Sequence, residues 1–170
     1  MIEFRNIGIE YFYYSPDAAW TLREDPVDLD ELAAKYWSSR WGREAFLMMT
    51  QMGWSHGACA EGPDQFREVI KHSEEFLKVY PQSEVSDRIR LELANAYATW
   101  WNVSQMEPDG YANPASYKPG AERARQRAIH LYLVYLQMQP SAEVRKRLDA
   151  LRENPKGSDT YDYFCEDYED

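Results

Sequence analysis

Cysteine is scarce in this chain, with two among 170 residues, Cys59 and Cys165. Two cysteines so far apart define neither a disulfide framework nor a zinc knuckle. No apolar run approaches the ~20 residues that a helix needs to cross a bilayer, and the first residues lack the basic and apolar segments of a signal peptide. We therefore expect no transmembrane segment and a cytoplasmic protein, or a periplasmic one if Met1 is not the natural start.

Recognisable catalytic motifs are also missing, including glycine-rich phosphate loops and nucleophile elbows. The best enzymatic candidate is the loop His56–Glu61, whose His, Cys and Glu are possible zinc ligands. Cys59 could also act as a nucleophile with His56 or His72 as its base. One close His–Cys pair does not complete a tetrahedral zinc site, and no family signature surrounds Cys59. We expect no catalytic residue, metal, cofactor or small-molecule substrate.

Positive charge is in short supply, with 19 Lys and Arg against 29 Asp and Glu and a formal net charge of −10. The acids gather at the ends of the chain, and residues 157–170 hold six acids and no base. The bases gather in residues 118–156, where there are nine against four acids. Nucleic-acid binders need clustered cations, whereas this chain is acidic overall and has acidic ends. No nucleic acid is therefore expected as a partner. The basic stretch could instead receive the acidic tail or an acidic partner.

Hydrophobic periodicity predicts helices and no sheet, because apolar residues recur at helical spacing and nowhere alternate over a sustained stretch. Proline and glycine mark the helix ends, and Ser141 is a good N-cap. About six helices are predicted, over residues 28–37, 41–52, 63–80, 84–103, 120–139 and 141–153. Aromatic residues make up 15 % of the chain, which suits either half-buried packing or a docking surface.

An internal repeat occurs at an offset of 59 residues. In each copy a helix ends with an aromatic residue and leucine, a proline follows, and a new helix begins at Glu-Val. The paired residues are Ile70 and Ile129, Phe76 and Tyr135, Leu77 and Leu136, Pro81 and Pro140, Glu84 and Glu143, Val85 and Val144, Arg88 and Arg147, and Ile89 and Leu148. This arrangement predicts two helical hairpins, because proline stops one helix and the next packs back antiparallel.

The repeat resembles the tetratricopeptide repeat (TPR) family over about residues 64–154. In that family the first helix of a hairpin carries a large, a small and an aromatic residue, as in Leu93–Tyr97. The second helix carries a small residue, an aromatic four residues on and a proline eight beyond that, as at Ala128, Tyr132 and Pro140. The phrase Phe76–Ser83 is similar to the helix-ending phrase of a bacterial subclass found in cell-envelope assembly proteins.

The resemblance implies an all-α fold of antiparallel hairpins in a degenerate superhelix, with a compact generic helical bundle as the alternative. The chain departs from the family by an insertion over about residues 104–119 within a hairpin. We expect a single helical domain over residues 1–156, with an irregular aromatic segment at 1–27. An acidic aromatic tail, residues 157–170, follows it.

Two segments look suited to recognition. The insertion is flanked by aromatic residues that either anchor a partner or cap the helix groove. The tail alternates acids with aromatics, so we expect it to dock on a partner or on the basic helices through Arg123, Arg125, Arg127, Arg145 and Arg147. The predicted partner-binding residues are Trp100, Trp101, Tyr111, Tyr117, Arg123, Arg127, Tyr161, Tyr163, Phe164 and Tyr168. Asn102–Ser104 also matches a glycosylation sequon, which has little weight without a secretion signal.

The sequence therefore favours a non-enzymatic scaffold or accessory subunit of a complex that binds a protein or peptide partner in a helical groove. The alternative is a structural subunit of a large protein assembly, membrane-associated or not. An enzyme that uses the His56–Glu61 loop is the third hypothesis.

Overall fold

The computed structural model describes residues 12–13, 22–23, 33–51, 64–107 and 113–164. The fold class is all-α, as predicted: the described residues form five α-helices, one short 3-10 helix and one pair of two-residue strands. The chain divides into two compact units, residues 1–49 and 50–170. The division into one domain over residues 1–156 and a tail over residues 157–170 stays a prediction.

The first unit contains the strand pair, which the periodicity did not predict, and most of helix α3 (Arg40–Gln51). Strand β1 (Phe12–Tyr13) pairs antiparallel with β2 (Leu22–Arg23). The Ser39 hydroxyl caps the beginning of α3 by accepting a hydrogen bond from Gly42 N at 3.2 Å. Of the helix predicted over residues 28–37, the described part is helical at residues 33–35 and continues as a turn.

The helices of the second unit begin and end within a few residues of their predicted bounds. They are α4 (Phe66–Val79), α5 (Ser86–Ser104), α6 (Ala121–Met138) and α7 (Ala142–Glu153). The short 3-10 helix η1 (Pro114–Ser116) lies in the insertion and was not predicted. The Ser141 hydroxyl accepts a hydrogen bond from Val144 N at 3.3 Å, which confirms the predicted N-cap of α7. None of the described helices is both long enough and apolar enough to cross a membrane.

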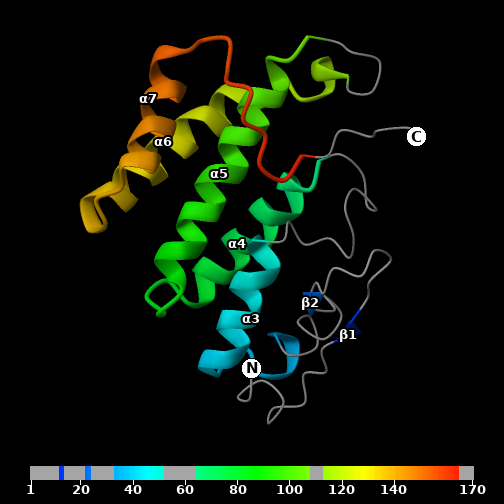
Figure 1. Cartoon of the computed structure of the whole chain (residues 1–170), viewed down its shortest axis with the longest axis vertical. Helices are drawn as coiled ribbons and strands as arrows, with labels where there is room; N and C mark the ends of the chain where they lie inside the picture. The colour runs from blue at the N-terminus through cyan, green and yellow to red at the C-terminus, as the bar shows by residue number, and fades with distance from the viewer. Residues whose placement is uncertain (1–11, 14–21, 24–32, 52–63, 108–112, 165–170) are drawn as a thin grey trace. The chain divides into compact units, whose positions relative to one another are not determined.

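Helix α5 lies at the centre of the second unit and packs against both α4 and α6, while α7 packs against α6 (Figure 1). The core takes one face of α4, as the periodicity predicted. The central helix α5 is buried on more than one face, because all of residues 93–99 and 101–104 are buried. The fully buried side chains of the core include Phe66, Val69, Phe76, Ile89, Tyr132 and Leu148. Each such side chain contributes about 1.5–3 kcal/mol by leaving water. The superhelical arrangement of these helices stays a prediction.

The end of the described chain returns across this helical layer. Residues 154–164 run from the end of α7 over α5 to the beginning of α4 (red in Figure 1). There Phe66 N donates a hydrogen bond to Tyr163 O at 2.9 Å, which satisfies an N–H group at the first turn of α4. We call residues 157–164 the tail segment. Its course brings polar residues of α5 and α7 against an extended stretch of chain.

Candidate functional site

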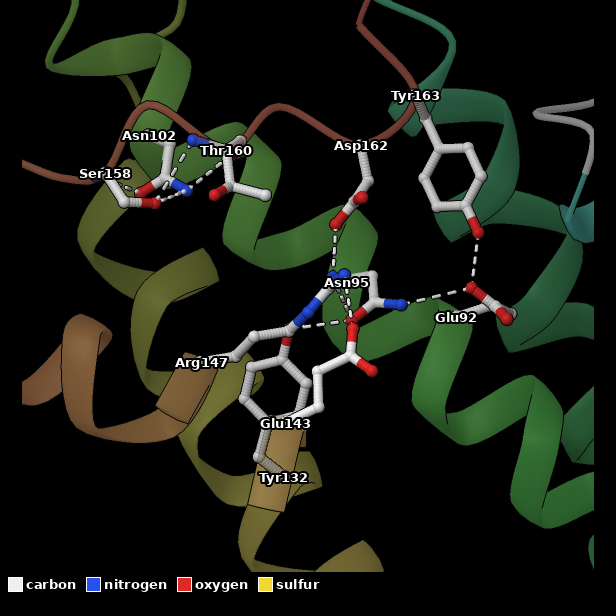
Figure 2. Close-up of polar contacts among 10 residues, drawn as sticks. All are labelled: Glu92, Asn95, Asn102, Tyr132, Glu143, Arg147, Ser158, Thr160, Asp162 and Tyr163. Atoms are coloured by element: carbon white, nitrogen blue, oxygen red, sulfur yellow. Dashed lines mark hydrogen bonds and ion pairs between the residues drawn. The ribbon is translucent and has the colours of Figure 1, made fainter. Parts of the chain in front are cut away.

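Asn102, near the end of α5, binds the backbone of the tail segment (Figure 2). Its Oδ1 accepts a hydrogen bond from Ser158 N at 3.1 Å, and its Nδ2 donates to Thr160 O at 2.9 Å. The same Nδ2 donates to Ser158 Oγ at 2.9 Å. The Asn102 side chain is 5 % exposed, so these bonds satisfy an amide that would otherwise be buried without partners. The oxygen and the nitrogen of the amide thus bind backbone atoms two residues apart in the tail segment.

Gly157 allows this close approach. Its φ of 79° lies in the left-handed region, which glycine adopts without steric cost. A Cβ at this position would lie 3.2 Å from Asn102 Cα and 3.2 Å from Asn102 Oδ1. Another residue would therefore strain the backbone and push the tail segment away from α5.

Arg147, on α7, holds the middle of the tail segment. Its Nη1 lies 2.5 Å from Asp162 Oδ2 and 3.1 Å from Asn95 Oδ1, and its Nη2 lies 3.3 Å from Glu143 Oε1. The guanidinium therefore joins a tail carboxylate to α5 (Figure 2). Because the pair is partly sheltered from water, it is screened less than a surface ion pair.

Asn95 extends the network across α5. Its Oδ1 also accepts a hydrogen bond from the phenol of Tyr132 on α6 at 2.8 Å, and its Nδ2 donates to Glu92 Oε2 at 3.1 Å. That oxygen of Glu92 accepts a second hydrogen bond, from the phenol of Tyr163. The chain of bonds therefore leaves the tail at Asp162 and returns to it at Tyr163 (Figure 2).

The electrostatics of this network keep its phenols neutral. Burial raises the pKa of Tyr132, and burial together with the adjacent Glu92 carboxylate raises the pKa of Tyr163. Burial acts to lower the pKa of the Arg147 guanidinium, but the Asp162 carboxylate raises it above its ordinary value. At neutral pH the phenols are therefore hydrogen-bond donors and Arg147 is a cation.

An aromatic cluster receives the other end of the tail segment. The Phe164 ring lies 6.2 Å from the Tyr117 ring in edge-to-face geometry, and Tyr117 packs on Phe66 at 5.9 Å. Trp100 Nε1 donates to Tyr117 O at 2.8 Å. The Arg67 guanidinium lies 5.4 Å from the centre of the Tyr117 ring, within the range of a cation–π contact. The insertion and the tail, predicted as separate recognition segments, thus contact each other.

Two cavities flank the tail segment, and Glu143, Arg147 and Asp162 line both. The larger has a volume of about 720 Å³ and is lined also by Leu91, Glu92 and Asn95. The smaller, about 290 Å³, extends toward Asn102 and Ser158. The tail segment therefore leaves part of the space over α5 and α7 unfilled.

The predicted partner-binding residues differ in how deeply they are buried. Trp101 and Tyr117 are 8 % and 6 % exposed and belong to the core of the second unit. Trp100, Tyr161, Tyr163 and Phe164 are half-buried. Arg123 and Arg127 are exposed, and Arg127 Nη2 lies 3.7 Å from Glu74 Oε1. Tyr111 and Tyr168 lie outside the described residues, as does the His56–Glu61 loop.

The predicted docking of the tail on the basic helices is confirmed in a narrower form. Of the five arginines proposed for it, Arg147 alone forms an ion pair with the described part of the tail. Arg125 instead lies over the Trp101 ring at 5.1 Å and donates to Leu151 O at 2.7 Å. Arg145 is exposed on α7. Charge alone did not distinguish these arginines, because the helix face that meets the tail selects one of them.

Sequence reasoning missed Glu92 and Asn95 altogether and noted Asn102 only as a sequon. Asn95 and Asn102 are 9 % and 5 % exposed. The one available signal was their spacing of seven residues, which places both on the same face of one helix. Nothing in the sequence marked that face as buried. Buried polar residues need partners, and the tail supplies some of them.

Comparisons with known proteins give no family for the chain: no protein-family model, curated protein or solved structure matches it. The likeness to tetratricopeptide repeats therefore stays a resemblance.

Proposed function

We propose that this chain is a non-enzymatic interaction scaffold or accessory subunit that binds a protein or peptide partner in the groove over α5 and α7. The observation that supports it most is the pair of bonds from Asn102 to Ser158 N and Thr160 O. They bind backbone atoms of the tail segment and do not depend on its side chains, and main-chain hydrogen bonds of this kind supply affinity when a protein binds a peptide.

The second support is the chemistry of the groove. Arg147 supplies a cation. It donates a hydrogen bond to Asn95 Oδ1, and the phenol of Tyr132 donates to the same oxygen and so holds Asn95 in place. The cavity of about 720 Å³ beside it gives room for side chains of a ligand. The mechanism is geometric: the helices hold the donors and acceptors, and the charge of Arg147 sets the orientation of the bound segment.

The experiment is affinity capture from the source organism followed by cross-linking mass spectrometry. The full chain is compared with Arg147→Glu and with Arg145→Glu, which makes the same charge change two residues away on the exposed face of α7. We expect a partner that is lost with Arg147→Glu, retained with Arg145→Glu, and cross-linked to Lys146 beside the groove. Equal recovery with both variants would contradict the proposal. Stoichiometric zinc that disappears with Cys59→Ala would favour the enzyme hypothesis instead.

A second candidate, a structural subunit of a large assembly, has one observation in its favour. Val79 and Met138 are 60 % and 45 % exposed. They occupy equivalent positions of the 59-residue repeat, at the last residues of α4 and α6. An apolar residue repeated at two helix ends suits burial against a neighbouring subunit. This candidate predicts that the isolated chain self-associates and that Val79→Ser with Met138→Ser restores a monomer, as measured by light scattering.

A further inference from the structure

The tail segment is bound as a peptide ligand is bound, through its backbone first. Asn102 contacts two backbone groups of the tail, two residues apart. At the other end Tyr163 O accepts from the first N–H group of α4. Residues 157–164 belong to no helix or strand. The helices supply the partners of three backbone groups, Ser158 N, Thr160 O and Tyr163 O.

The side chains of the tail segment indicate which ligand side chains the groove prefers. Asp162 pairs with Arg147, Tyr163 donates to Glu92, and Phe164 packs edge-to-face on Tyr117. A carboxylate followed by two aromatic residues meets a cation, an acceptor and an aromatic ring in that order. The charge is complementary at one point, where the guanidinium of Arg147 faces the carboxylate of Asp162.

The fit of the tail segment is incomplete. Tyr163 has a φ of 58°, in the left-handed region that residues other than glycine rarely adopt. The cavity of about 720 Å³ remains beside Asp162 and Tyr163. All four residues from Tyr161 to Phe164 keep part of their surface in water. A segment with the same contacts, a relaxed backbone and side chains that fill the cavity would bind better than the tail does.

We propose that the groove over α5 and α7 is a receptor site for an extended segment of a partner protein that presents a carboxylate followed by aromatic residues. The tail segment occupies this site within the same chain, and the partner segment displaces it. This inference rests on the proposed function and adds the chemistry of the ligand and its competitor. The tail reduces the apparent affinity for the partner by the fraction of time that it fills the groove.

The test measures binding of a fluorescent peptide to the full chain. The probe has the sequence of residues 157–164, Gly-Ser-Asp-Thr-Tyr-Asp-Tyr-Phe, with blocked ends. Asp162→Lys in the protein places a cation opposite Arg147 and so weakens the binding of the tail. It changes no residue of α5 or α7. We expect the probe to bind this variant at least about tenfold more tightly than the unaltered chain, because the open fraction rises. Circular dichroism of both proteins checks that the helices are intact.

The matched controls are made in the peptide, so they cannot disturb the fold of the protein. N-methylation at the position of Ser158 removes the donor to Asn102, and replacement of the aspartate at position 162 by lysine removes the partner of Arg147. Each should weaken binding by about tenfold or more, since each removes one hydrogen bond to a charged or buried group. A shuffled peptide of the same composition should not bind.

Three outcomes would overturn the inference. In the first, the shuffled and native peptides bind equally. In the second, the unaltered chain and Asp162→Lys bind the probe with the same affinity. In the third, the unaltered chain forms a concentration-dependent dimer that Asp162→Lys abolishes, which would make a second copy of this chain the occupant. Loss of peptide binding with Arg147-dependent partner capture intact would refute this inference alone, whereas the absence of any Arg147-dependent partner would refute the proposed function.

Discussion

The two helix pairs related by the repeat, α4–α5 and α6–α7, share their turns and core positions but differ in their contacts with the tail. Each first helix closes with a backbone bond of 2.8 Å, Tyr80 N to Phe76 O and Gln139 N to Tyr135 O, and a proline follows. In each second helix an apolar residue is fully buried, Ile89 in α5 and Leu148 in α7. The repeated pattern therefore specifies the turn and the core of both pairs.

The difference lies at the equivalent arginines. Arg88 is exposed on α5, whereas Arg147 reaches Asn95 on α5 and Asp162 in the tail. The same residue type at the same repeat position is thus exposed in one pair and contacts the tail in the other. The comparison teaches that a repeat specifies packing, while the position of each pair in the layer decides which surface becomes a site.

The largest effects should come from the equivalent core positions. Ile89→Ala and Leu148→Ala should each lower the free energy of unfolding by about 2–5 kcal/mol, because both side chains are 0 % exposed and leave a cavity. Urea denaturation followed by circular dichroism measures both. A loss for Leu148→Ala far below that for Ile89→Ala would show that the two pairs do not share one cooperative core.

The next largest loss of stability should come from Arg147 and not from its repeat equivalent, Arg88. Arg147→Met should cost about 1–2 kcal/mol, because it leaves Asp162 without its ion-pair partner while keeping the length of the side chain. Arg88→Met, the matched control, should cost less than Arg147→Met, because Arg88 is exposed whereas Arg147 is partly buried. Limited proteolysis should cut the tail faster in Arg147→Met than in Arg88→Met. Equal cleavage would show that the ion pair does not hold the tail.

The serines of the two turns should differ by less. Ser86→Ala removes a hydroxyl that donates to Tyr80 O at 2.6 Å and accepts from Ser83 N at 2.9 Å. Ser141→Ala removes one capping bond to Val144 N. We expect losses of about 1 kcal/mol at each, with Ser86 the larger. Thermal unfolding of the two variants side by side measures this, and a larger loss at Ser141 would contradict the ranking.

The smallest effect concerns pH in the α4–α5 pair. Burial, with a hydrogen bond to Glu74, raises the pKa of Tyr97 to about 12. The unfolded chain loses this proton first, so the contribution is complete below pH 10 and disappears as pH rises through 12. Tyr97→Phe should reduce the fall in stability between pH 9 and 11 by at most about 1 kcal/mol, after allowance for solvent screening. Urea titrations at both pH values test it, and an unchanged slope would contradict it.

Much of the fold followed from the sequence because its signals are local. Pro81 and Pro140 end α4 and α6 whatever surrounds them, and the apolar stripe of α4 predicts its buried face. The bounds of α7 followed from Ser141 at one end and the loss of periodicity at the other. These signals need no knowledge of which helix neighbours which.

The site did not follow in the same way because it is assembled from distant segments. Asn102 and Ser158 lie 56 residues apart, and Tyr163 and Glu92 lie 71 apart. Charge predicted that the tail would meet arginines, but selecting Arg147 required knowing which face of α7 adjoins α5. The sequence grouped the aromatic residues near the insertion, yet the burial of Tyr117 and its contact with Phe164 depend on tertiary packing.

The contact of Gly157 with Asn102 has a consequence for related sequences. A Cβ at position 157 would lie within 3.2 Å of the asparagine that binds the tail backbone, and the φ of 79° disfavours residues other than glycine. Natural selection for a docked tail should therefore act on the two positions jointly. Orthologues that lose the glycine should also lose the asparagine, and such paired losses would mark lineages in which the groove is left open.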